Sequence, residues 1–191
     1  MLGTDGNPIR RLAQPAAGVL DADRTADTRS FIIVSGLLIA SFLVETTSLL
    51  MEPNGEAAGW VAPFVLEGSS HAVLLALFPA LAMVLTRAPL AAETWRWAVP
   101  VHLAAFVTFT VVHVLAFAAI RTVVFAALGE RYGFELTDPL VWIYELRKDA
   151  FTYVLFVLLI ALNRAAQYRR LEQRAAQEDA RAGGQITLKC G

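Results

Sequence analysis

The sequence predicts an all-α membrane protein, a bundle of four transmembrane helices with both termini on the cytoplasmic side (N-in/C-in). Its 191 residues are 57% hydrophobic and only 17% charged, which is too apolar for a soluble domain of this length. Several stretches are apolar over about 20 residues, the helical length that crosses a hydrocarbon core of about 30 Å. Lysine and arginine are also distributed unequally among the segments between these stretches.

The transmembrane domain is expected over residues 31–165, with spans at about 31–51, 67–85, 98–120 and 146–165. The first two are apolar over nearly their whole length. The third continues apolar to Leu128, so its helix is expected to extend until Gly129 ends it. The fourth is the shortest apolar run, because charged residues must form its ends.

Both tails are expected to be polar and cytoplasmic. Residues 1–30 scatter Arg, Asp, Pro and Gly without a compact apolar run, which predicts a disordered tail and no removable signal peptide. Residues 166–191 begin as a polar helix rich in Arg, Gln and Glu, and Gly183 and Gly184 are expected to end it.

Positive charge sets the predicted orientation, because cytoplasmic segments close to helix ends retain Lys and Arg. The N-terminal tail has four arginines, the first loop at 52–66 has none, and the second loop has Arg87 and Arg96. Six basic residues follow in the C-terminal tail. The third loop fits less well, because its basic residues are accompanied by acidic ones.

Ionisable residues gather at one depth, in the outer half of the predicted bundle. A charged group in a membrane costs about 3 kcal/mol or more unless it pairs or reaches water, so such a group of residues is a candidate sensing site. Glu67 and His71 are four residues apart, which places a carboxylate beside an imidazole on one helix face. The predicted cluster comprises Glu67, His71, His113, Arg121, Glu145, Arg147, Lys148 and Asp149.

A purely structural interpretation of these polar residues stays open. Hydrogen-bonded side chains join membrane helices, at about 0.6–2 kcal/mol per contact, without any ligand. This applies to His102 and His113, which lie on one stripe of the third span. Glu45 can mark the hydrated outer end of its helix, and the charges from Glu145 to Asp149 can be ordinary interfacial charge.

The chemistry of most enzyme classes is missing from the sequence. It contains no Walker loop, GxGxxG turn, HExxH helix or GxSxG elbow, and its only cysteine is Cys190, so we expect no enzyme. His71 and His113 can in principle supply two imidazoles, but intramembrane histidines are more often hydrogen-bonded, so neither haem nor a metal is expected. The net charge of -1 gives no electrostatic indication of nucleic-acid binding.

Four stretches resemble a known family. They are PVHLAA from Pro100, FTVVHV from Phe109, Ile120 with Arg121, and YELRKD from Tyr144, followed by Tyr153. Together they resemble the four-helix membrane region that precedes the DNA-binding domain in membrane-anchored LytTR-type transcriptional regulators of bacteria. The likeness extends from Phe31 to Arg170.

This resemblance implies a sensory and anchoring module in a bacterial plasma membrane, surrounded by lipid. It implies that residues 185–191 are the opening strand of a truncated LytTR domain, so this chain alone is expected to contact no promoter DNA. It also implies a homodimer, because partners that read DNA commonly bind symmetric half-sites. The family does not supply the signal.

Two other functions stay open. One is the input module of a sensor histidine kinase, which a phosphoacceptor helix encoded downstream would favour. The other is a small transporter or a haem-binding membrane subunit, which the outer histidines alone support. Absorbance at the Soret band or substrate flux would identify the latter.

Overall fold

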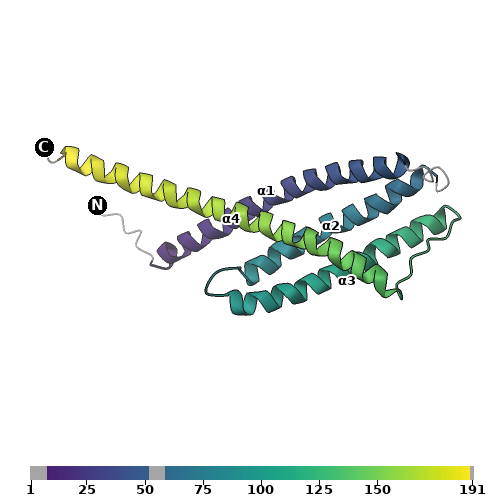
Figure 1. Cartoon of the computed structure of the whole chain (residues 1–191). Coiled ribbons are helices and arrows are strands. Elements are labelled where there is room, and N and C mark those ends of the chain that lie inside the picture. Colours follow the sequence, from purple (N-terminus) through teal and green to yellow (C-terminus); the bar gives the residue numbers. More distant parts are fainter. Residues whose placement is uncertain (1–7, 52–58, 190–191) are drawn as a thin grey trace. The chain divides into compact units, whose positions relative to one another are not determined.

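A computed structural model describes residues 8–51 and 59–189, and within these ranges the chain forms four α-helices and no β-strand (Figure 1). They are α1 (Pro8–Met51), α2 (Val61–Arg87), α3 (Trp95–Ala127) and α4 (Pro139–Lys189). Each contains a stretch long and apolar enough to cross a membrane. The prediction of an all-α four-helix bundle is confirmed for this part of the chain.

The chain divides into two compact units, and each is described by itself. The bundle unit is Phe31–Leu158, and it holds α2, α3 and the adjoining parts of α1 and α4. The terminal unit is Met1–Ser30 with Leu159–Gly191, and its described part consists of the outer ends of α1 and α4.

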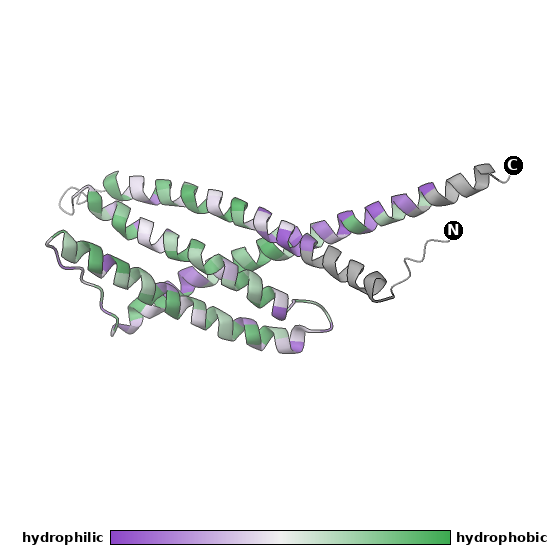
Figure 2. Ribbon diagram, turned by 180° about the vertical axis from the view of Figure 1, so that it is seen from behind, coloured by the Kyte–Doolittle hydropathy of each residue, from purple (hydrophilic) through white to green (hydrophobic). Residues whose placement is uncertain are grey.

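The core of the bundle unit lies between α2 and α3, which run side by side in opposite directions (Figures 1 and 2). Phe117 and Val114 of α3 are fully buried and pack with Val73 of α2. Burying a side chain such as Phe117 contributes about 1.5–3 kcal/mol in water. In lipid the gain comes instead from close packing and interhelical hydrogen bonds.

Aromatic contacts hold the other two helices of the bundle unit against this pair. Phe42 of α1 lies 6.3 Å from Phe64 and 5.9 Å from His71, both on α2, measured between ring centroids. Tyr153 of α4 packs edge-on against Phe109 of α3 at 5.7 Å, and Phe156 packs against Phe78 of α2 at 5.9 Å. Edge-to-face pairs of this kind contribute about 0.5–1.5 kcal/mol each.

Local sequence fixes two helix ends near the candidate site. At the end of α3, Gly129 has φ +79°, the left-handed conformation that glycine adopts most easily, as the sequence predicted. The amide of Glu130 donates to the Phe125 carbonyl at 2.9 Å, closing the last turn. At the start of α4, Asp138 accepts a 2.9 Å hydrogen bond from the Leu140 amide, and Pro139 occupies the first turn.

Large apolar side chains cover much of the outer surface. Ile32, Ile39 and Leu43 of α1 are at least half exposed, as are Phe151 and Leu158 of α4. Figure 2 shows hydrophobic residues along α2 and α3, whereas the coloured stretch of α4 before its grey end is mostly hydrophilic. Surfaces of this kind suit lipid rather than water.

The structure corrects three predictions about the tails and the fourth span. Residues 8–30 were predicted to be disordered, but they are helical, and Asp23 and Asp27 of this segment bond to α4 within the terminal unit. The fourth helix begins at Pro139 rather than near residue 146, because Asp138 caps it. Residues 185–189 are helical rather than a strand, since two glycines cost only about 1 kcal/mol each in a long helix.

Some predictions fall outside the described residues. These are the first seven residues of the N-terminal tail, residues 52–58 of the first loop, and Cys190 and Gly191 of the expected strand.

Candidate functional site

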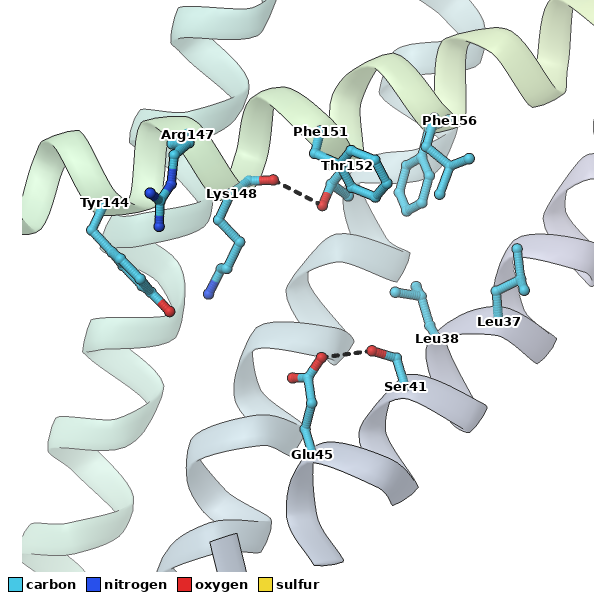
Figure 3. A pocket seen from close by; sticks show the side chains of 11 residues that line it. Leu37, Leu38, Ser41, Glu45, Tyr144, Arg147, Lys148, Phe151, Thr152 and Phe156 are labelled. Atoms are coloured by element: carbon cyan, nitrogen blue, oxygen red, sulfur yellow. Dashed lines mark hydrogen bonds between the residues drawn. The ribbon is translucent and has the colours of Figure 1, made fainter. Parts of the chain in front are cut away.

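A cavity of about 490 Å³ lies between α1 and α4 within the bundle unit (Figure 3). One part of its wall is polar, with Glu45 from α1 and Arg147 and Lys148 from α4. The remainder is apolar, and Leu37 and Phe151 are among its residues. Its volume falls in the range of about 300–1,000 Å³ that is usual for small-molecule sites.

Charges of both signs face each other across this cavity. In Figure 3 Tyr144 and Lys148 extend from α4 in the direction of Glu45. The Ser41 hydroxyl donates to the Glu45 carboxylate at 2.7 Å and so fixes its orientation. Arg147 and Tyr144 are stacked, with the guanidinium carbon 5.7 Å from the ring centroid. The cavity therefore offers an anionic group, two cationic groups and an apolar wall.

Glu45 and Glu67 meet His71 where α1 faces α2. A ligand atom of each of the three residues lies within 4.8 Å of the others. The predicted contact between the Glu67 carboxylate and the His71 ring is wrong in its detail: Nδ1 of His71 is bonded to the main-chain carbonyl of Glu67 at 2.8 Å. The carboxylate instead lies beside Glu45, which was expected to mark the hydrated outer end of its helix.

His113 lies at the centre of a second, fully enclosed cluster. Its ring and the Asp149 side chain are completely buried, and Nδ1 lies 2.9 Å and 3.1 Å from the two carboxylate oxygens. Its Nε2 lies 3.0 Å from the Ser70 hydroxyl of α2. Since a carboxylate only accepts, Nδ1–H donates to Asp149, and the Ser70 hydroxyl, which can donate or accept, bonds to Nε2. One imidazole thus joins α2, α3 and α4.

Glu145 completes this buried cluster one turn before Asp149. Its side chain is 8% exposed, and its ligand atoms lie within 4.8 Å of those of His113 and Asp149. Lys148 approaches Oε2 of Glu145 at 3.1 Å but is itself 42% exposed. This ion pair places the Lys148 ammonium against the buried Oε2.

Arg121 is held by its own set of partners. Its guanidinium donates to the Ser69 hydroxyl at 2.9 Å, the Leu66 carbonyl at 2.6 Å and the Tyr132 hydroxyl at 2.8 Å. The ring of Phe117 lies 4.1 Å from the guanidinium carbon. Arg121 therefore ties α3 to α2 and to the loop that precedes α4, which is a structural role.

His102 is likewise fully hydrogen-bonded, as its structural interpretation requires. Its Nε2 lies 2.9 Å from the Ala88 carbonyl, an acceptor, so Nε2 carries the proton. Its Nδ1 then accepts from the Tyr153 hydroxyl at 2.9 Å. The residue closes the end of α2 and joins α3 to α4.

A polar junction in the terminal unit was missed from the sequence. Arg164 of α4 donates to both oxygens of Asp27 of α1, each at 2.8 Å, and the Tyr168 hydroxyl donates to Asp23 at 2.6 Å. Asn163 donates to the Ser30 hydroxyl at 2.9 Å. The available signal was the i, i+4 spacing of Asp23 and Asp27, which places both carboxylates on one helix face.

The predicted sensing cluster is therefore divided among adjoining groups, which Glu45 and Lys148 connect. His113, Glu145 and Asp149 form the buried cluster, Arg147 and Lys148 line the cavity, and Glu67 with His71 joins Glu45. Arg121 bonds instead to Ser69, Leu66 and Tyr132.

The fold and the site define a class: an all-α helical bundle with four candidate membrane spans and buried polar clusters between its helices, within the described residues. In comparisons with family models, curated proteins and solved structures, no match to this chain was found.

Proposed function

We propose that this chain is the membrane sensory and anchoring input module of a LytTR-like transcriptional regulator. It crosses a bacterial plasma membrane four times, with both termini in the cytoplasm. An extracytoplasmic or lipid-borne signal engages the polar residues between the helices, and a DNA-binding partner domain delivers the output. The proposal is supported by the resemblance of four stretches to that family and by the distribution of basic residues along the chain.

The observation that carries the proposal is the continuity of α4. This helix has 51 residues and includes Glu145, Lys148 and Asp149 near its start. It then continues as a hydrophilic extension rich in Arg, Gln and Glu (Figure 2). A signal that changes the packing around Lys148 thus acts on the helix that leads to the output.

The cavity between α1 and α4 supplies a place for such a signal. A ligand shifts a conformational equilibrium only by its difference in affinity for two states. The cavity walls come from two different helices, so a change in the separation of Glu45 and Lys148 alters its affinity directly. Ligand binding and a displacement of α4 are coupled in this proposal.

The test uses the whole chain fused, after Gly191, to a LytTR DNA-binding domain and assayed with its promoter reporter in bacteria. The double variant Glu45→Gln with Lys148→Gln removes one negative and one positive charge from the cavity wall without a large change in volume. Reporter output is expected to change about fivefold or more, since coupling free energies of about 1–3 kcal/mol correspond to about 5–150-fold.

The matched control is Glu93→Gln, which removes a charge from the exposed connection between α2 and α3. Its output is expected to equal that of the unmodified fusion, with equal amounts of each protein in the membrane fraction. A cavity variant indistinguishable from this control would contradict the proposed sensing site. A fusion that never regulates the promoter would contradict the proposed class.

One observation favours a second function, the input module of a sensor histidine kinase. The α4 helix is still helical at Lys189, where the LytTR interpretation expects a strand. A continuing helix suits a phosphoacceptor helix. The genomic DNA after codon 191 discriminates the two functions: a basic, β-rich continuation favours the regulator, and a helical segment with a phosphoacceptor histidine favours the kinase.

A further inference from the structure

We propose that His113, Glu145 and Asp149 form a binding site for a divalent first-row transition-metal cation. One nitrogen or oxygen atom from each residue lies within 4.8 Å of the other two, as in a ligand set that surrounds one ion. The three residues are 0%, 6% and 0% exposed. The site is enclosed by the bundle unit, and it uses two helices, α3 and α4.

The sequence places the three ligands correctly for this purpose. Glu145 and Asp149 are four residues apart on α4, so both carboxylates project from one helix face. His113 projects from the facing side of α3. Carboxylates and imidazoles from facing helices are the usual ligands of metal sites built inside helical bundles.

Buried side chains balance the charge of the cluster only in part, because Asp149 is paired with the buried His113 ring whereas Glu145 is paired with the partly exposed Lys148. Two carboxylates are buried there, and the ion pair with Lys148 involves a side chain that is 42% exposed. The guanidinium of Arg121 is directed to Ser69, Leu66 and Tyr132 instead. A buried carboxylate without compensation is costly, and a divalent cation offsets both charges at once.

The second, independent observation is the state of Glu145. Its Oε2 is enclosed and the whole side chain is 8% exposed, while its ion-pair partner, the Lys148 ammonium at 3.1 Å, belongs to a side chain that is 42% exposed. A lysine that is partly exposed can turn its flexible side chain toward water and leave this oxygen to a cation. Glu145 lies within reach of His113 and Asp149, where the ion is proposed.

Ser70 fits the role of an orienting residue. With a cation at Nδ1 of His113, the ring proton moves to Nε2, which lies 3.0 Å from the Ser70 hydroxyl. A hydroxyl both donates and accepts, so Ser70 holds the ring with or without the ion. Histidines that bind metals commonly donate their second N–H in this way.

The ligand set also restricts the ion. One imidazole nitrogen with two carboxylates suits Mn²⁺, Fe²⁺, Co²⁺ or Zn²⁺ better than Ca²⁺ or Mg²⁺, which prefer oxygen ligands alone. The cluster of Glu45, Glu67 and His71 is a weaker candidate, because Glu45 is exposed and Nδ1 of His71 is bonded to a carbonyl. The proposed metal site is therefore the buried cluster of His113, Glu145 and Asp149.

This inference deepens the proposed function, because it names a ligand class for part of the sensing cluster, yet its test needs no promoter. Full-length chain carrying Cys190→Ser is purified in detergent without an affinity tag, stripped with a chelator and titrated with Co²⁺. The substitution removes the only thiol. Saturable binding of one Co²⁺ per chain is expected, with visible d–d absorption, and Zn²⁺ is expected to displace the Co²⁺.

Two isosteric variants locate the site: Glu145→Gln and Asp149→Asn are each expected to weaken Co²⁺ binding at least tenfold. Glu67→Gln makes the same chemical change in the other cluster and is expected to bind as the parent does. If Asp149→Asn does not yield folded protein, Glu145→Gln alone decides. The inference is overturned if folded parent protein takes up no Co²⁺ saturably, or if Glu67→Gln abolishes binding while Glu145→Gln retains it. Either result leaves the reporter experiment unaffected.

Discussion

His102 and His113 lie on the same stripe of α3 but have different surroundings. His102 bonds to a hydroxyl and a carbonyl, neither of which is charged. His113 bonds to a hydroxyl and a carboxylate, with a second carboxylate in reach. The same residue type therefore closes a helix end at one depth and belongs to a candidate ion site at another.

At the scale of single residues, His102→Ala is expected to lower the free energy of unfolding by about 1–3 kcal/mol, because the buried Ala88 carbonyl loses its partner. Thermal unfolding in detergent, monitored by size-exclusion chromatography, measures this loss of stability. Thr108→Ala on the exposed side of α3 is the control and is expected to change stability by less than about 0.5 kcal/mol. Equal melting of the two variants would refute the structural role of His102.

At the scale of elements, the site is positioned by the defined ends of the helices and by polar contacts between them. Gly129 ends α3 and Asp138 starts α4, and Asp149 of α4 then bonds to His113 of α3. In the terminal unit, Arg164 and Asp27 join α4 to α1 by two hydrogen bonds. Bidentate pairs of this type fix orientation as well as adding stability.

Gly129→Ala is expected to destabilise the protein by about 1–2 kcal/mol, because φ +79° is unfavourable for any residue with a Cβ. The effect comes from the backbone alone, since a Cβ at this position meets nothing within 4 Å. Gly133→Ala is the matched control, because Gly133 has equal space and does not have positive φ. Thermal melting in detergent compares them; no difference between the two would contradict the assignment of the helix end.

At the scale of the whole molecule, four candidate spans predict that both chain ends lie on the same side of the membrane. Cys190 is a natural reporter, as the only cysteine. In intact spheroplasts, a membrane-impermeant maleimide is expected to leave Cys190 unlabelled until the membrane is opened.

Two variants in a Cys190→Ser background complete this test. Thr4→Cys is expected to behave as Cys190 does, and Leu136→Cys, at an exposed position between α3 and α4, is expected to be labelled in intact cells. Labelling of one terminus but not the other in intact cells would rule out an even number of spans. The N-in/C-in arrangement would then be wrong.

The sequence by itself determined the helices that can span a membrane, the end of α3 at Gly129, and the presence of His113, Glu145 and Asp149 in one candidate cluster. These features are local: composition sets the solvent of a segment, and the rise of a helix sets the depth of each residue. An intramembrane charge is also visible without knowledge of its neighbours.

Only the tertiary structure decided which polar residues meet. In the structure Arg121 bonds to residues outside the predicted cluster, and Glu67 lies beside Glu45. Asp27, which lies in a segment predicted to be disordered, bonds to Arg164. The sequence specifies depth along each helix, but the rotation of a helix about its axis and its choice of neighbour depend on packing against the other helices. For this reason one predicted cluster became several adjoining groups, of which the buried His113 cluster has the clearest chemistry.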